Sequence, residues 1–421
     1  MKPFNIVVVL FSLFTIHLSP FTAAEAKIYI DITSPAFRKV PIAIAELSGP
    51  SGREISDIVR DDLDFSGIFL PLDREAFIEP PSQPFQPRNW SVLGADLVVK
   101  GTVKGDKNIA ASVSLYDVVE GREIFRKEYT SETSLLRPLA HTISNDIYRE
   151  ITNTEGVFRT RIAYVVRRSD RDELSITDWD GHRQTLPGVR GAVLLGPRWS
   201  RDGSRLIYSS ERNRQWGVYL LDFKKLSETR VFSSGGTNLA GDFFPDSDQI
   251  VLSSSKEGTP DIYTYSISRS RLVRLTSSRT IDISPVVSPD GGLIAFVSDR
   301  HGSPQIFIMD REGHDARRLT FSGSYNTSPA WSPRGDKIVF SGRQGGKNQI
   351  FTTNPDGSAL TQLTERGNNE DPSFSPDGRF IVYTSDRDGE KSIYIMRSNG
   401  EAQKRITPRG VKAFAPRWSP Q

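Results

Sequence analysis

The sequence predicts a mainly β protein: a six-bladed β-propeller closed by its C-terminal strand and preceded by a small α/β domain. Three observations predict this fold. A repeat of 44 or 43 residues runs through the chain, each repeat contains strand-like segments, and the first part of the chain lacks the repeat. The repeat is clearest at the apolar residue before each SPDG-like turn. These residues are Trp199, Phe243, Val287, Trp331, Phe374 and Trp418.

Each repeat predicts four antiparallel strands, which we call A to D in chain order. Strand A carries the apolar residue before the turn, and segments such as RLIYSS (205–210) and GVYLLD (217–222) are rich in β-branched and aromatic residues. Turns such as Asp202-Gly203 separate the strands, because glycine adopts the positive φ of a tight hairpin. A four-stranded unit of this length is typical of a propeller blade.

The two ends of the repeat region predict how the ring closes. The first unit begins at Arg161 with strand B and has no strand A, whereas 413–419 is an extra strand A after the last complete unit. We therefore expect the C-terminal strand to complete the first blade. Trp418 then occupies the core position of Trp199 and Trp331, and its burial contributes about 2–3 kcal/mol.

The N-terminal part has a different pattern. Residues 1–24 predict a secretory signal peptide, with cleavage after Ala24 or Ala26, and the apolar run from 6 to 18 is short for the alternative, a membrane anchor. In 25–155 we expect strands at 27–32 and 40–47, a hairpin over 95–117, and helices over 53–67 and 135–152. These elements predict a small α/β domain, with the propeller over 156–421.

The composition favours no catalytic chemistry. Cysteine is absent, which excludes disulfides, thiolate metal sites and a cysteine nucleophile. No G-x-S-x-G motif occurs, and His182, His301 and His314 fall in predicted turns without metal-ligand spacing. The net charge of +3 gives weak support for a nucleic-acid surface. We therefore predict no catalytic residues, no cofactor and no metal, and keep a propeller hydrolase or a sugar-binding propeller as the alternative.

The segments just before each strand A, here called the pre-A segments, differ from blade to blade. In a propeller they gather at one mouth of the central channel, where they offer apolar, amide, hydroxyl and acidic groups in a concave ring. Such a ring suits an extended peptide or a partner's loop. The pre-A segments are 192–195, 237–240, 280–284, 324–328, 368–371 and 412–415.

Several stretches resemble a known family. They are DLDFSGIFLPLDR (62–74), WSVLGADLVVKGTV (90–103), FRTRIAYVV (158–166), the SPDG units and the terminal APRWSP. Because of these stretches, the chain resembles the TolB family of the Tol-Pal system of Gram-negative bacteria. The resemblance extends over nearly all of the predicted mature length. The resemblance implies a periplasmic, non-enzymatic protein that binds the lipoprotein Pal at the propeller mouth and TolA through its mature N-terminal segment. It also implies a role in outer-membrane integrity and cell division, with other outer-membrane proteins as possible partners and no insertion into the membrane.

The implied sites fall on two sets of residues. The Pal surface, from the resemblance and the pre-A reasoning together, comprises Leu195, Thr237, Asn238, Ile283, Ser284, Asn326, Thr327, Asn369, Glu370 and Asp371. The TolA segment comprises Glu25, Ala26, Lys27, Ile28, Tyr29, Ile30 and Asp31, which favours cleavage after Ala24. The alternating apolar residues of this segment suggest an added strand in a partner's sheet.

Overall fold

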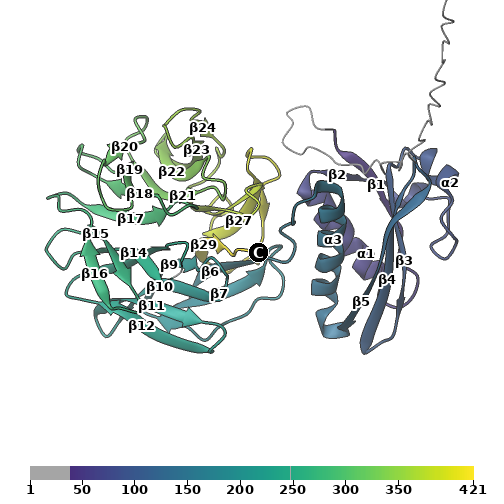
Figure 1. Cartoon of the computed structure of the whole chain (residues 1–421), viewed down its shortest axis with the longest axis horizontal. Helices are drawn as coiled ribbons and strands as arrows, with labels where there is room; N and C mark the ends of the chain where they lie inside the picture. Colours follow the sequence, from purple (N-terminus) through teal and green to yellow (C-terminus); the bar gives the residue numbers. More distant parts are fainter. Residues whose placement is uncertain (1–37, 247) are drawn as a thin grey trace, which may run out of the picture.

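The computed structural model describes residues 38–246 and 248–421. It contains an α/β domain and a β-propeller that lie side by side (Figure 1). Residues 1–24 and 25–31, predicted as signal peptide and TolA segment, lie outside the described residues. None of the helices within the described ranges is long and apolar enough to cross a membrane.

The propeller has six four-stranded antiparallel sheets, as predicted. We number the blades 1 to 6 in the order β29-β6-β7-β8, β9–β12, β13–β16, β17–β20, β21–β24 and β25–β28. The A strands are β9 (Val193–Trp199), β13 (Asn238–Phe243), β17 (Asp282–Val287), β21 (Asn326–Trp331), β25 (Asn369–Phe374) and β29 (Ala413–Trp418). The B strands are β6 (Arg161–Arg167), β10 (Arg205–Arg212), β14 (Gln249–Ser254), β18 (Leu293–Ser298), β22 (Ile338–Gln344) and β26 (Phe380–Ser385).

The outermost D strand is the shortest strand in every blade except blade 2. The C strands are β7 (Asp172–Asp178), β11 (Gln215–Asp222), β15 (Asp261–Ser266), β19 (Gln305–Asp310), β23 (Lys347–Thr353) and β27 (Ser392–Arg397). The D strands are β8 (Arg190–Gly191), β12 (Ser227–Ser233), β16 (Arg271–Arg274), β20 (Arg317–Arg318), β24 (Thr361–Gln362) and β28 (Lys404–Arg405). Apart from β12, which has seven residues, the D strands have two to four residues and leave little unpaired edge for association with other chains.

The C-terminal strand closes the ring, which confirms the prediction. β29 pairs antiparallel with β6, so that Trp418 lies opposite Ile162. The Trp418 side chain is buried, its Nε1 donates a hydrogen bond of 2.7 Å to Thr160 Oγ1, and its ring stacks on Phe380 at 6.1 Å. The last strand therefore joins blade 1 to blade 6 through both backbone and side-chain contacts.

The N-terminal domain is a five-stranded mixed sheet in the order β2-β1-β3-β4-β5, with its two longer helices packed on it. Its strands are β1 (Val40–Ile44), β2 (Phe69–Pro71), β3 (Leu97–Lys104), β4 (Asn108–Asp117) and β5 (Arg122–Glu132). Its helices are α1 (Gly52–Ser66), α2 (Pro87–Ser91) and α3 (Leu136–Thr152), with 3-10 turns η1 (Arg74–Ala76) and η2 (Thr133–Leu135). Apolar residues at helical spacing, such as Ile55, Ile58 and Leu63, are buried on α1.

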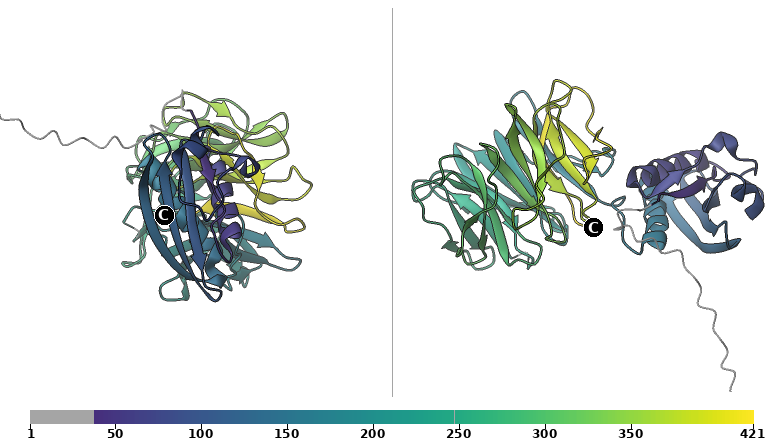
Figure 2. Two further views of the ribbon diagram at one scale, coloured as in Figure 1. Left: turned by 90° about the vertical axis from the view of Figure 1, so that its right-hand side faces the viewer. Right: turned by 90° about the horizontal axis from the view of Figure 1, so that it is seen from above.

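The end of α1 forms one part of the contact between the two domains. The Phe65 ring lies 5.1 Å from Phe380 in blade 6 and 5.2 Å from Trp179 in blade 1. Gly67 ends the helix with φ 74°, and a Cβ there would lie 2.7 Å from Arg397 Nε, so glycine allows the close approach. The C terminus lies at the same junction, where Gln421 Nε2 donates to Glu155 O (Figure 2).

The topology puts the N-terminal domain and the pre-A segments on opposite faces of the propeller. In an antiparallel blade the A–B and C–D turns lie on one face, and the B–C and D–A connections lie on the other. Trp179 and Arg397, which contact the N-terminal domain, lie at C–D turns. The pre-A mouth therefore faces away from the N-terminal domain.

Candidate functional site

A ring of six half-exposed side chains surrounds the pre-A mouth. Each lies four residues before the apolar residue that ends its A strand. The residue before each of them is buried, because side chains alternate along a strand. Four of the six are apolar, so the ring, here called the mouth ring, is mainly hydrophobic. The mouth ring consists of Leu195, Leu239, Ile283, Thr327, Glu370 and Phe414.

A β-bulge follows the mouth ring in every A strand. Each A–B pairing shifts register at this level. In five blades the next residue has a left-handed backbone and precedes a proline, which lacks the N–H that a regular ladder uses. These residues are Gly196 (φ 57°), Ser284 (φ 54°), Ser328 (φ 53°), Asp371 (φ 53°) and Ala415 (φ 52°). Blade 3 has its register shift at Ala240-Gly241 instead. A strained conformation repeated at one level is typical of a functional surface.

Behind the mouth ring, inside the blades, lies a belt of buried polar side chains at the start of four A strands. Asn238, Asp282, Asn326 and Asn369 are at most 2% exposed. Asn369 Nδ2 donates to Gln349 Oε1 at 2.8 Å, and its Oδ1 accepts from Arg387 at 3.1 Å. Asn326 and Asn238 are hydrogen-bonded within the blades in a similar way. The side chains of these three predicted asparagines therefore point into the blades and position the mouth ring.

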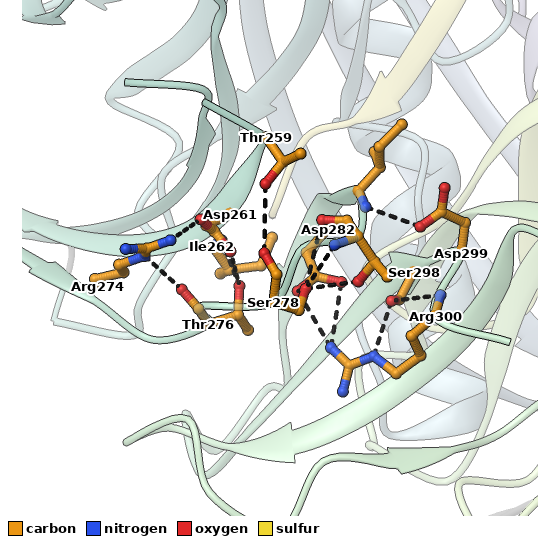
Figure 3. Close-up of polar contacts among 12 residues, drawn as sticks. Thr259, Asp261, Ile262, Arg274, Thr276, Ser278, Asp282, Ser298, Asp299 and Arg300 are labelled. Atoms are coloured by element: carbon orange, nitrogen blue, oxygen red, sulfur yellow. Dashed lines mark hydrogen bonds and ion pairs between the residues drawn. The ribbon is translucent and has the colours of Figure 1, made fainter. Parts of the chain in front are cut away.

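Figure 3 shows the same arrangement between blades 3 and 4. The Asp282 carboxylate accepts hydrogen bonds from Ser278 Oγ at 3.1 Å and Arg300 Nη2 at 3.2 Å. In blade 3, Thr276 Oγ1 accepts from Ile262 N at 2.9 Å and donates to Asp261. These hydrogen bonds hold the D–A connection against the start of strand C. They thereby also position the pre-A segment, which follows in the chain.

Sequence reasoning missed this belt, although a repeated signal marks it. An apolar residue followed by threonine ends blades 3 to 6, and each threonine hydroxyl accepts from the backbone N–H of an isoleucine in strand C, at 2.9–3.1 Å. The four pairs are Leu275-Thr276, Leu319-Thr320, Leu363-Thr364 and Ile406-Thr407.

Four charged side chains lie deeper in the channel. Burial raises the pKa of Asp242 to about 6, although Arg198 and the backbone N–H groups of Val287 and Phe243 oppose this shift. Burial also raises the pKa of Asp371 and lowers that of Arg198. Arg417 Nη1 donates to Asp371 O at 3.0 Å. The channel thus offers charged donors and acceptors below an apolar ring.

At the other mouth the channel opens into a funnel of about 340 Å³. Residues from all six blades line it, among them Trp199, Trp331 and Trp418 near the A–B turns. This funnel lies on the face of the N-terminal domain, and it reaches Arg198, Asp242 and Arg417 of the channel.

The remaining predicted site residues lie on or beside the mouth ring. Leu195, Ile283, Thr327 and Glu370 belong to it, and Ser284 and Asp371 follow it in the bulges. Glu370 is held by Lys391 Nζ at 2.6 Å and Asn348 Nδ2 at 2.9 Å. Thr237 is half-buried, and its backbone N–H donates to Ser255 Oγ at 2.8 Å. Leu239 and Phe414 complete the ring and fall inside the pre-A segments 237–240 and 412–415.

The histidines divide into two groups. His182, His301 and His314 are exposed in turns, as predicted. His141 is 2% exposed and lies on the buried face of α3. A polar residue at a buried helical position is a signal in the sequence that the prediction did not use.

A closed six-bladed propeller with a strained, mainly apolar ring at one mouth, and a second domain on the far face, defines a two-domain propeller protein. The TolB amino-terminal domain matches residues 28–124, and the TolB beta propeller domain matches residues 148–421. The chain belongs to the TolB family.

Individual relatives agree with this assignment. The chain is 33% identical over 234 residues to the Tol-Pal system protein TolB of Alcanivorax borkumensis, covering 53% of this chain and 54% of that protein. It is 35% identical over 244 residues to that of Anaeromyxobacter dehalogenans, covering 53% and 56%. The chain thus spans about half the length of the curated relatives it matches. The crystal structure of TolB from Acinetobacter baumannii covers 91% of this chain and 97% of its own, with 28% identity and a TM-score of 0.83.

Proposed function

We propose that this chain is a non-enzymatic, periplasmic scaffold of the Tol-Pal system that supports outer-membrane integrity and cell division. In this proposal, Pal binds at the pre-A mouth, and TolA binds the mature N-terminal segment 25–31. The observation that carries the proposal is the mouth ring, a mainly apolar ring on strained bulges above charged side chains of the channel, facing away from the N-terminal domain. Family membership supports the choice of partners.

The mouth ring suits a protein loop better than a small substrate. Its apolar side chains Leu195, Leu239 and Ile283 gain from burial by a partner, whereas Glu370 and Thr327 orient it through hydrogen bonds. A sugar-binding propeller would instead present several aromatic faces, and the mouth ring has one aromatic residue, Phe414. A propeller hydrolase remains the competing function, and turnover of a glycan or peptide by the pure protein would favour it.

Calorimetric titration with Pal tests the site. Ile283→Asp places a charge in the apolar part of the mouth ring, so we expect Pal affinity to fall at least about tenfold, which corresponds to about 1.4 kcal/mol. Leu226→Asp is the matched control, because Leu226 is 88% exposed in the C–D turn of blade 2, on the opposite face. Unchanged affinity in a folded Ile283→Asp protein would exclude the mouth ring as the Pal site.

The second partner is tested separately. Deleting 25–31 from the mature chain removes the segment and should abolish TolA binding while leaving Pal binding intact or stronger. Intact or stronger Pal binding follows if Pal favours a state in which the segment is docked on its own protein. In that docked state the segment is hidden from TolA. Equal TolA affinity with and without saturating Pal would leave two independent sites.

A further inference from the structure

A buried polar cluster lies where the two domains meet. Asp62 comes from α1, His141 from α3, and Asp180 from the C–D turn of blade 1. The His141 Nδ1 lies 2.8 Å from Asp62 Oδ2, and its Nε2 lies 3.3 Å from Asp180 Oδ2. The second contact has ion-pair distance but poor hydrogen-bond geometry. One imidazole therefore contacts a carboxylate of each domain.

Aromatic rings pack around this cluster. The Trp179 ring packs edge-on against His141 at 6.2 Å, and Phe65 and Phe158 pack against Trp179 at 5.2 and 5.7 Å. Asp62 is 1% exposed and Asp180 is 8% exposed. Because water and salt screen such buried charges poorly, their balance matters to the free energy of domain docking.

A proton on His141 balances the charges of the cluster. Arg137 donates to Asp180 Oδ2 through Nε at 2.9 Å and Nη2 at 2.5 Å, which compensates one carboxylate. With a neutral imidazole, the Asp62 carboxylate would have no cation beside it in the cluster. With an imidazolium, two cations meet two carboxylates and the cluster is neutral.

We infer that protonated His141 clamps the N-terminal domain to the propeller, and that loss of its proton releases the domain. The cluster lies on the face of the propeller opposite the mouth ring, so the inference does not rest on Pal binding there. It uses a carboxylate of each domain, so it exists only when the domains are docked.

The ionisation of the three groups agrees with this geometry. Burial disfavours the charged imidazole, but Asp180 and Asp62 outweigh it and raise the pKa of His141 to about 9. Burial raises the pKa of Asp62, which His141 offsets only in part. Burial also acts on Asp180, but His141 and Arg137 hold its pKa below the usual range. The two carboxylates differ because Asp180 has two cations beside it.

Other charged groups near His141 come from the propeller and the domain junction. Asp178 lies close enough for its charge to interact with His141, and Arg183 Nη1 lies 3.8 Å from Asp178 Oδ2. Arg159, Arg161 and Arg183 line the groove that His141 borders. Burial raises the pKa of Asp178, and the charges of Arg183 and His141 oppose this shift.

The sign of the pH dependence follows from the raised pKa. The contribution of His141 to docking is complete below its ordinary pKa of about 6.5 and is lost as pH rises toward 9. We expect the docking equilibrium to weaken at least about tenfold between pH 6.5 and pH 9.5.

The absence of cysteine allows a direct test. Dyes on Val119→Cys and Leu226→Cys, which are 81% and 88% exposed, report the distance between the domains by energy transfer. In the full mature chain, transfer should change between pH 6.5 and 9.5. His141→Gln should show the released value at both pH values, whereas His314→Gln, an exposed histidine in blade 4, should behave like the parent. Transfer that does not change with pH in the parent, or an unchanged pH dependence in His141→Gln, would overturn the clamp.

A second measurement covers the case in which His141→Gln fails to fold. Asp180→Asn alters an outer turn of the propeller and leaves the His141–Asp62 pair in place. The pKa of His141, read from its ring proton in NMR spectra of the mature chain with its four histidines, should be raised in the parent and lower in Asp180→Asn. A His141 that titrates near 6.5 in the parent, or identically in both proteins, would contradict the inference.

Discussion

At the residue scale, neighbouring polar residues serve two different purposes at the pre-A mouth. Asn326 and Thr327 are neighbours, yet Asn326 is buried and bonded to Gln305, whereas Thr327 is half-exposed in the mouth ring. Asn369 and Glu370 repeat this division in blade 6. The buried asparagines hold the D–A connection in place, so we expect their loss to affect stability first and binding only as a consequence.

Asn369→Ala should lower the free energy of unfolding by about 1–3 kcal/mol, because Gln349 and Arg387 lose a buried partner. Chemical denaturation measures the change. Thr327→Ala is the control, and its stability should stay within about 0.5 kcal/mol of the parent. Equal stability of Asn369→Ala and the parent would mean that the polar belt does not hold the mouth.

At the element scale, the A strands are defined by the bulge that follows the mouth ring. Five of them place a left-handed residue before a proline, and four of these residues are not glycine. A left-handed conformation costs such residues about 1–2 kcal/mol, which the surrounding sheet must offset. The repeated X-Pro step, visible in Ser284-Pro285 and Ser328-Pro329, is the sequence signal for this feature.

Substitutions at Ser284 test the strain. Ser284→Gly should leave stability unchanged or raise it by up to about 1 kcal/mol, because glycine adopts φ 54° without steric cost. Ser284→Val should lower stability by about 1–2 kcal/mol, since a branched Cβ crowds a left-handed backbone. Thermal unfolding of the pair separates backbone strain from any role of the hydroxyl, and destabilisation of equal size in both would point to the hydroxyl.

At the scale of the whole molecule, ring closure and domain docking share one apolar core. A continuous cluster of buried residues includes Ile55 and Leu63 of the N-terminal domain, Ile162 of blade 1, Phe380 of blade 6 and Trp418 of the closing strand. The N-terminal domain therefore packs on the seam where the two ends of the propeller meet.

Removing 413–421 should destabilise both domains together. The truncation exposes the edges of β6 and leaves Phe380 without Trp418, so the loss should be a large part of the about 5–15 kcal/mol typical of a native protein. Near-ultraviolet circular dichroism during heating measures the transition. Deletion of the exposed Gln421 alone is the control and should melt close to the parent. A truncated protein that melts cooperatively at the parental temperature would contradict the closure.

The sequence by itself determined the features that repeat or are local. The period of 44 or 43 residues predicted the six blades, the missing first strand A predicted the closure by 413–419, and helical spacing predicted α1 and α3. These patterns are visible because strand alternation and helical periodicity are set by residues close in the chain. The position of the mouth within the pre-A segments followed from the same regularity.

Only the tertiary structure decided which polar residues are buried and what they contact. Asn369 contacts Gln349, which is 20 residues away in the sequence, and Asp62 contacts His141, which is 79 residues away, so no local sequence pattern predicts either pair. The same holds for β5 in the N-terminal domain, whose alternation is weakened by its charged, exposed face. A polar side chain is buried where folding brings it hydrogen-bond or ion-pair partners from elsewhere in the chain. The presence of such partners, rather than the residue type, distinguishes the polar belt and the His141 clamp from the mouth ring.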